Sequence, residues 1–429
     1  MSRLAGMGAR WVVLALAFAA SPLSAQLPNP AAGVLGMGGN QTAGVRGFSA
    51  LSINPAGLGM PDGPSVSGSV ATVRGSAGLG PIGLGDLADY DDSEVPHEVR
   101  ERWLERIDRA NGERGWAGGE LTYLSVQMGG LAFQLSTTAD IVADLGPGAA
   151  ELLLFGNAGR TGEPAEIELT GSSLDVVAAS TAALGYGRAL VETEERAVAV
   201  GATLKYTVGH AMMTAMDLGG AASADPVQVA VEFPVVQSDE NLGLGDGDRG
   251  SGVGLDAGVA WREGRFQAGL SVQNLFNTFS WDEDKLLFRP GTISLTSEER
   301  RTDFRARAYA EAPERVRARV RELGYSPVVA AGVGYEVGPQ LYVSADVRQQ
   351  VGDDRSPSPN THVGAGAEYR PLPWLPVRGG AAAISDGYLF SGGLGLDLTL
   401  LQLDAAFARR RTHLGMASQV MVSLSLVLR

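Results

Sequence analysis

Nine charged side chains fall at alternate positions within segments whose intervening residues are mostly apolar. This spacing places them on one face of a β-strand, because successive side chains of a strand point to opposite sides. Such a face can bind a polar solute, or its opposite charges can pair with one another. We favour pairing, because an unpaired charge away from bulk water is costly. The nine candidates are Lys205, Asp256, Arg265, Asp346, Arg348, Glu368, Arg378, Asp397 and Asp404.

A separate acidic group lies among the glycines of residues 239–248. Asp239, Glu240, Asp246 and Asp248 offer carboxylate oxygens, which are the ligands that calcium prefers. Their spacing differs from that of an EF-hand loop, and a solvated acidic loop is the interpretation that we favour. The sequence leaves open whether this loop binds calcium.

Residues typical of catalytic centres are scattered. His97, His210, His362 and His413 are far apart in the chain, and neither cysteine nor a GxSxG motif occurs. The absence of cysteine also excludes disulfides, cysteine metal sites and a lipidated thiol. We therefore expect no enzymatic activity, no cofactor and no metal.

The N-terminus has the pattern of a secretory signal peptide. Arg3 and Arg10 precede an apolar run at residues 11–20, and the small residue Ala25 suits cleavage before Gln26. The run is shorter than the roughly 18 residues of a membrane-spanning helix. We expect residues 1–25 to be removed on export.

The remaining chain is rich in apolar residues but contains no long apolar run. Hydrophobic residues make up 45% of the sequence, so they must be distributed among polar ones. The formal net charge of −14 argues against nucleic-acid binding. Helical membrane spans are excluded, whereas transmembrane β-strands alternate apolar and polar residues in segments of about ten.

Alternation of this kind recurs along the chain and predicts about fourteen transmembrane strands. At residues 419–428, the positions Val420, Val422, Leu424 and Leu426 form one face. One face of each strand is expected to meet lipid and the other the lumen. The predicted strands are 64–75, 120–128, 130–138, 172–188, 196–210, 251–261, 265–276, 327–337, 339–349, 361–369, 376–384, 389–398, 401–411 and 417–429.

The connections between these segments alternate in length, as expected for periplasmic turns and extracellular loops. An even strand number then places both ends of the barrel in the periplasm. Residues 211–250 leave room for a further hairpin. Short connections are predicted at 129, 189–195, 262–264, 338, 370–375 and 399–400, and long ones at 76–119, 139–171, 211–250 and 277–326.

Two of the long loops carry helix signals. Val95, Val99, Trp103 and Ile107 follow one another at a spacing of four, which predicts an amphipathic helix. In the second loop, residues 296–299 match a capping box, and a helix is expected to follow and to break at a proline. These helices are expected to be lids on the barrel rim, or sites for lipid headgroups or a hydrophobic ligand.

The glycine-rich residues 33–39, followed by the run NPAGL at 54–58, resemble the N-terminal signature of the FadL superfamily. Residues 200–206 and 393–397 are more similar to its PorV-like branch. The resemblance implies an N-terminal plug inside the barrel. Alternatively, the motif only forms the turn into the first strand. The plug-motif residues are Asn54, Pro55, Ala56 and Gly57.

The sequence therefore predicts an all-β protein, a transmembrane antiparallel β-barrel with an N-terminal luminal plug. We expect a signal peptide at 1–25, a plug segment at 26–63 and the barrel at 64–429 of the bacterial outer membrane. The FadL resemblance implies a passive channel for hydrophobic small molecules. The PorV-like resemblance implies a carrier or tether for secreted proteins, with secretion machinery as partner, and a structural role without transport is a third hypothesis.

We predict that the mature protein begins at Gln26 and fractionates with the outer membrane, because of the signal-peptide pattern and the alternating strands. N-terminal sequencing of the protein extracted from isolated outer membranes tests both points. Recovery from the soluble periplasmic fraction would contradict the barrel.

Overall fold

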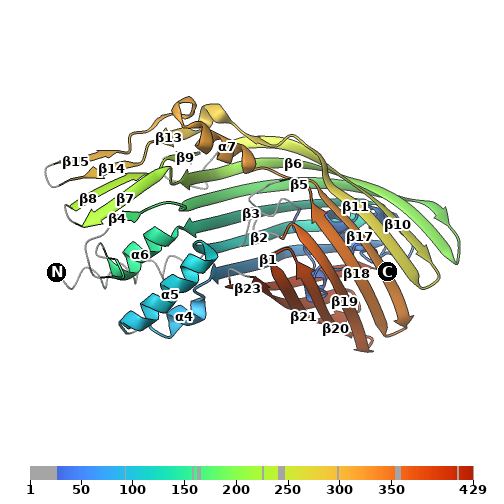
Figure 1. Ribbon diagram of the computed structural model, residues 1–429. Helices are drawn as coiled ribbons and strands as arrows, with labels where there is room; N and C mark the ends of the chain where they lie inside the picture. The colour runs from blue at the N-terminus through green and yellow to red at the C-terminus, as the bar shows by residue number, and fades with distance from the viewer. Residues whose placement is uncertain are drawn as a thin grey trace.

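The strands form a closed antiparallel barrel (Figure 1) in the computed structural model, which describes residues 27–91, 93–156, 159–161, 166–224, 227–239, 247–296, 299–352, 359–412 and 415–428. The expected signal peptide and its cleavage site lie outside these residues. In the described part of the chain, the fourteen barrel strands are β1 (Val66–Gly80), β2 (Glu113–Met128), β3 (Leu131–Leu145), β5 (Ser173–Glu192), β6 (Arg196–Met216), β10 (Gly250–Glu263), β11 (Phe266–Asn277), β17 (Val328–Gly338), β18 (Leu341–Gln350), β19 (Thr361–Leu372), β20 (Leu375–Ile384), β21 (Gly387–Leu398), β22 (Leu401–Thr412) and β23 (Gly415–Leu428).

Each barrel strand pairs with its sequence neighbour in the barrel, and pairing of β1 with β23 closes the ring. Closure gives every edge strand a neighbour, so that backbone N–H and C=O groups facing lipid are hydrogen-bonded within the protein. All fourteen predicted strands are confirmed, as is the alternation of connections. The short connections fall at 129–130, 193–195, 264–265, 339–340, 373–374 and 399–400. The long loops leave the opposite end, which is the outer end because such barrels carry short periplasmic turns.

The outward face of the strands is a belt of exposed apolar side chains. On β23, Val422, Leu424 and Leu426 are exposed, whereas Ser423 and Ser425 between them are buried toward the lumen. The predicted two-residue alternation is therefore the observed alternation between lipid-facing and luminal positions.

The outer end of the barrel is uneven, because the strands differ greatly in length. Strands β5 and β6 contain 20 and 21 residues, whereas β18 and β20 contain 10 each. About ten residues suffice to cross a membrane, so the longer strands continue beyond it.

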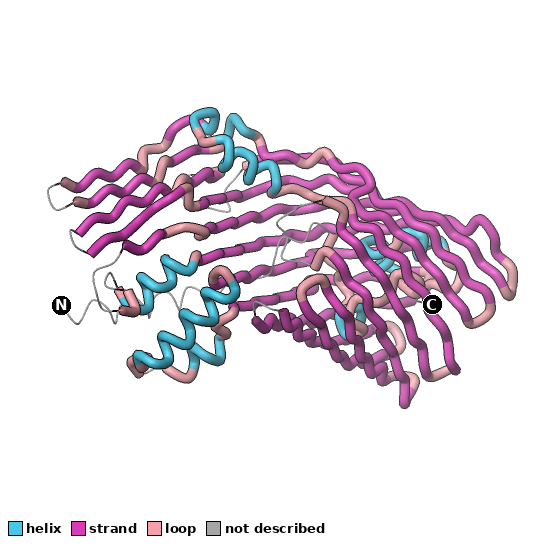
Figure 2. Tube along the Cα trace, viewed as in Figure 1, coloured by secondary structure: helices cyan, strands magenta, loops and turns pink. Residues whose placement is uncertain are grey.

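A second, five-stranded sheet extends this tall side (Figure 2). Its strands include the hairpin of β7 and β8, so the further hairpin anticipated within 211–250 is present. The sequence analysis missed the other members of this sheet. In sheet order, among the described residues, the strands are β15 (Arg300–Asp303), β14 (Thr292–Leu295), β8 (Val227–Glu232), β7 (Gly219–Ala224) and β4 (Glu166–Glu168).

Three helices pack together beside the tall side. They are α4 (Leu84–Ala88), α5 (His97–Ala110) and α6 (Pro147–Phe155). The predicted amphipathic helix is confirmed as α5, which buries Trp103 and Ile107 against the other two. A hydrogen bond from Arg106 holds the pKa of the Asp86 carboxyl below its ordinary value. Among the described residues, no helix combines the length and apolar character needed to cross a membrane.

The loop after β11 folds back over the inner face of the tall wall. It forms β12 (Ser280–Trp281), η3 (Glu283–Lys285), β13 (Leu287–Arg289), β16 (Arg307–Ala308), η4 (Tyr309–Glu311) and α7 (Glu314–Glu322), and β13 pairs with β9 (Val235–Gln237). Of the helix expected after residues 296–299, the piece before the break at Pro313 is wrong, whereas the piece after it is confirmed as α7. Thr296 and Glu299 instead close the turn between β14 and β15. The Thr296 hydroxyl accepts the Glu299 N–H in this turn, and the same hydrogen bond would form at the start of a helix.

Helix α7 begins after Pro313 and is anchored by a buried ion pair. The Arg319 guanidinium donates to both carboxylate oxygens of Asp175 on β5, at 2.9 and 2.6 Å. Thr214 of β6 donates to the same carboxylate. Val316 and Val320 pack into an apolar cluster with the inward side chains of β5 and β6. Helix α7 is thus fixed to the wall.

We predict that Leu424→Arg impairs barrel assembly because it places a charge near the middle of the lipid-facing belt, at a cost of about 2–4 kcal/mol. The matched control is Val427→Arg on the same strand, since Val427 lines a luminal space together with the carboxylates of Glu368 and Asp404. Heat-modifiable migration of outer-membrane extracts measures the folded fraction. Equal folded fractions for the two variants would refute the assigned register.

Candidate functional site in the barrel lumen

The lumen contains residues 27–60, here called the N-terminal segment. It comprises α2 (Ala32–Gly36), η1 (Gly47–Ser49), α3 (Ala50–Ile53) and η2 (Pro55–Gly59). Helix α2 contacts β20 to β23, whereas η2 contacts β5, β6 and β10 across the barrel. The segment therefore bridges opposite walls.

The NPAGL motif anchors the segment to the β10 wall. Asn54 is fully buried, and its amide nitrogen donates to the carbonyl oxygens of Thr42 and Val259, at 3.0 and 3.1 Å. Its amide oxygen accepts the N–H of Ala56 and caps η2, which Pro55 begins. Asn54 thus joins two parts of the segment to a strand, which is more than a turn into β1 requires.

Side chains of the wall bond several backbone groups of the segment. The wall supplies amides, hydroxyls and a carboxylate, and it acts as donor to carbonyls and as acceptor of N–H groups. The wall side chains that donate to carbonyl oxygens of the segment include Gln134 to Pro28 (2.7 Å), Thr203 to Leu51 (3.1 Å), Gln273 to Ser52 (2.6 Å) and Ser391 to Gly36 (2.9 Å). The N–H partners are Ser67 for Phe48 (2.9 Å), Asp346 for Thr42 (2.9 Å) and Ser423 for Ala32 (3.0 Å).

Glycines of the wall allow the backbone of the segment to approach closely. We call these wall glycines the glycine belt. A Cβ at Gly201 would overlap the carbonyl oxygen of Pro55, and one at Gly380 would overlap Met37. Gly187, Gly201 and Gly258 lie directly across from one another on three adjacent strands. The sequence analysis missed this belt. Its members are Gly187, Gly201, Gly258, Gly269, Gly366 and Gly380.

Two groups of the nine charged candidates form ion pairs in the lumen. Lys205 and Asp256 are both buried and lie 2.6 Å apart. Arg378 bridges Glu368, at 2.6 Å, and Asp404.

The remaining candidates have different surroundings. Asp397 pairs with Arg370, a residue absent from the candidates, which also contacts Glu368. Asp346 bonds the segment at Thr42, and Arg348 donates to the Gly39 carbonyl at 3.3 Å. Arg265 is not part of the lumen. It is exposed in the turn at 264–265, where its guanidinium reaches the Val337 carbonyl.

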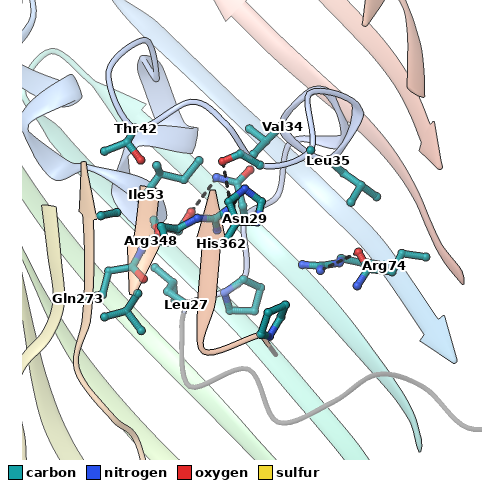
Figure 3. Close-up of a pocket in the computed structure, with 18 of the residues that line it drawn as sticks. Leu27, Asn29, Val34, Leu35, Thr42, Ile53, Arg74, Gln273, Arg348 and His362 are labelled. Carbon is teal, nitrogen blue, oxygen red and sulfur yellow. Dashed lines mark hydrogen bonds between the residues drawn. The ribbon is translucent and has the colours of Figure 1, made fainter. Parts of the chain in front are cut away.

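A cavity of about 200 Å³ lies between the segment and the wall (Figure 3). Apolar side chains of the segment, such as Leu27, Val34 and Ile53, face it together with Arg348 and His362 from the wall. A wider vestibule of about 730 Å³ opens toward the long loops. Pro359, Asn360 and Arg410 line both spaces.

The boundary between these spaces is marked by a cation–π contact. The guanidinium carbon of Arg410 lies 5.1 Å from the ring centre of Trp116. Both side chains are buried. On the vestibule side, burial raises the pKa of the Asp217 carboxyl above its ordinary value.

An ion pair also holds the periplasmic end of the segment. Arg46 and Asp62 lie 2.8 Å apart. Burial acts to raise the pKa of Asp62, but the charge and hydrogen bonds of Arg46, together with the charge of Arg262, keep that pKa below its ordinary value.

The possible calcium loop is only partly visible. Asp239 and Asp248 are described, whereas Glu240 and Asp246 lie outside the described residues. In the part of the chain that the structure covers, no group of three or more acidic, histidine or cysteine side chains is arranged to hold a metal.

The closed ring of strands and its apolar outer belt define an outer-membrane β-barrel. Residues 102–346, more than half of the chain, match the family described as "F plasmid transfer operon, TraF, protein", and the chain belongs to this family. A search of curated proteins finds no match.

Solved structures of the FadL group are similar over most of the chain. A Pseudomonas aeruginosa FadL homologue is 13% identical, with 94% of this chain and 99% of that chain covered and a TM-score of 0.46. The Ralstonia pickettii toluene transporter TbuX is 15% identical (93% and 97% covered, TM-score 0.46), and the Pseudomonas putida toluene transporter TodX is 12% identical (93% and 98%, 0.47). Similarity at this level assigns no substrate to this chain.

We predict that Gly201→Ala destabilises the folded protein by about 1–3 kcal/mol, because its Cβ would overlap the Pro55 carbonyl between two constrained backbones. Gly379→Ala is the matched control, since a Cβ there meets nothing within 4 Å. Thermal unfolding in detergent reports stability, and trypsin cleavage at Arg46 reports release of the segment. If both variants melt and are cleaved alike, the close packing of the belt has been misassigned.

Proposed function

We propose that the protein is a passive outer-membrane channel for small hydrophobic molecules, and that residues 26–63 form its luminal plug. The observation that carries the proposal is the shared lining of the vestibule and the inner cavity, which joins the outer surface to the N-terminal segment. Leu27, Val34 and Ile53 give that cavity apolar surface of the kind that small-molecule sites use.

The contacts of the segment suit a plug that can move. The barrel is held by strand ladders, whereas the segment has no ladder and is held to the wall by apolar packing and by side-chain bonds such as that between the Ala32 N–H and Ser423, at 3.0 Å. Displacing the segment would leave the ladders intact. Passage of a solute therefore requires rearrangement of the plug but no opening of the barrel.

This proposal includes export through a signal peptide at 1–25 and transport without catalysis. Outer-membrane lipid and hydrophobic small molecules are the proposed partners. The paired luminal charges, such as Lys205 with Asp256, serve to fix the wall and plug rather than to bind the solute.

A second candidate is a carrier or tether for another protein. The tall side of the barrel and its five-stranded sheet offer a broad outer surface that a channel does not need. The family description names an operon for plasmid transfer, in which a protein partner would be expected. Deletion of β7 and β8 would abolish this role while leaving small-molecule passage unchanged.

We predict that tying the plug to the wall blocks passage. Ala32→Cys with Ser423→Cys joins α2 to β23 at an existing backbone-to-hydroxyl contact, and the chain has no cysteine to compete. Oxidised cells should take up radiolabelled toluene slowly, and a thiol reductant should restore uptake. Each single cysteine variant, treated with the same oxidant, is the control.

Removal of residues 27–60 provides the complementary test, because the strand ladders remain and the lumen empties. Conductance in planar bilayers should rise. Unchanged conductance, or full uptake by the oxidised double variant, would overturn the channel with a movable plug.

A further inference from the structure

The inner cavity carries an excess of positive charge, although the whole chain has a formal net charge of −14. Arg74, Arg348 and Arg410 line it, and among the described lining residues Glu120 is the single carboxylate. Arg74 and Glu120 pair at 3.2 Å. The lining also contains Arg348 and Arg410, and the carboxylates that act on them electrostatically, Asp346 and Asp386, lie outside the lining.

Arg348 makes only long contacts with neutral groups among the described residues. Its Nη2 donates to the Gly39 carbonyl at 3.3 Å and lies 3.4 Å from Nε2 of His362. The Asn40 amide nitrogen donates to the Met37 carbonyl, so the Asn40 oxygen accepts the His362 Nε2–H at 2.8 Å. With its Nε2 protonated, His362 offers no acceptor there to Arg348. The Arg348 Nε has no hydrogen-bond partner among the described residues.

Gln350 adds a second unused donor beside Arg348. It is two residues further along β18, it is 7% exposed, and it also lines the cavity. Its amide nitrogen has no partner in the described part of the chain. A buried donor without an acceptor costs free energy, so these N–H groups favour a ligand that supplies acceptor oxygens.

The remainder of the lining is apolar and defines the rest of the ligand. Leu27, Val34 and Ile53 of the N-terminal segment and Val328 of β17 border the same space. Arg410 lies where the cavity meets the vestibule and would face an anion as it arrives. A carboxylate bonds a guanidinium more strongly than a neutral oxygen does.

We propose that this cavity binds a small organic anion, with its carboxylate at Arg348 and Gln350 and its apolar ring or short chain against the N-terminal segment. The proposal deepens the channel function and rests on it for biological purpose. It adds small apolar molecules with an anionic group to the hydrophobic solutes proposed for the channel.

Equilibrium binding to the purified full-length protein in detergent tests the proposal. The probes are benzoate and benzamide, which share a ring but differ in charge, and the readout is isothermal titration calorimetry. Benzoate should bind saturably and at least about tenfold more tightly than benzamide, since a hydrogen bond to a charged group is the stronger.

Variants identify the residue responsible. Arg348→Gln should weaken benzoate binding by about tenfold or more and leave benzamide unchanged, and Arg348→Lys should recover part of the loss. Arg411→Gln is the matched control, because Arg411 is exposed on the outer face of β22. Heat-modifiable migration of each variant establishes that the barrel is folded.

Equal affinities for benzoate and benzamide, no saturable benzoate binding, or unchanged binding by folded Arg348→Gln protein would each overturn the anion site. Failure of the channel has a different signature. If the oxidised plug-locked variant takes up toluene normally while benzoate still binds through Arg348, the site stands and the channel proposal falls.

Discussion

Backbone polar groups at membrane depth have no water to bond, and this constraint underlies the whole structure. The barrel meets it by closing β1 onto β23. The N-terminal segment lies inside that ring without a strand neighbour, so wall side chains must take the place of a ladder. Gln134, Gln273 and Ser423 each bond a backbone group of the segment and are themselves buried.

The same constraint governs where charge lies in the lumen. A buried ion needs a fixed counter-ion, and Arg378 is paired with Glu368 and Asp404. Among the described residues, the Arg348 guanidinium donates a hydrogen bond to the neutral Gly39 carbonyl and to no carboxylate, which distinguishes it from the paired luminal ions.

The sequence predicted the barrel strands because each carries its own two-residue alternation, and α5 because its apolar spacing is helical. Pairing between strands depends on register, which no single segment encodes. Glu368 lies directly opposite Arg378, but Lys205 lies opposite Gly254 and reaches Asp256 diagonally. The short strands of the outer sheet lack alternation long enough to detect. The glycine belt was equally hidden, because its role depends on where the N-terminal segment lies.

The glycine belt has a consequence for how this lumen can diversify. At Gly201 or Gly380 the first side-chain carbon already meets backbone, so nearly every substitution there should be removed by selection for folding. Positions such as Val34 and Gln350 border the cavity, so a change of side chain there meets open space on one side. New solute preferences should therefore arise by substitution at these cavity positions, while the belt remains glycine in related sequences. The lining of the cavity would then change in evolution while the contact between wall and segment stays the same.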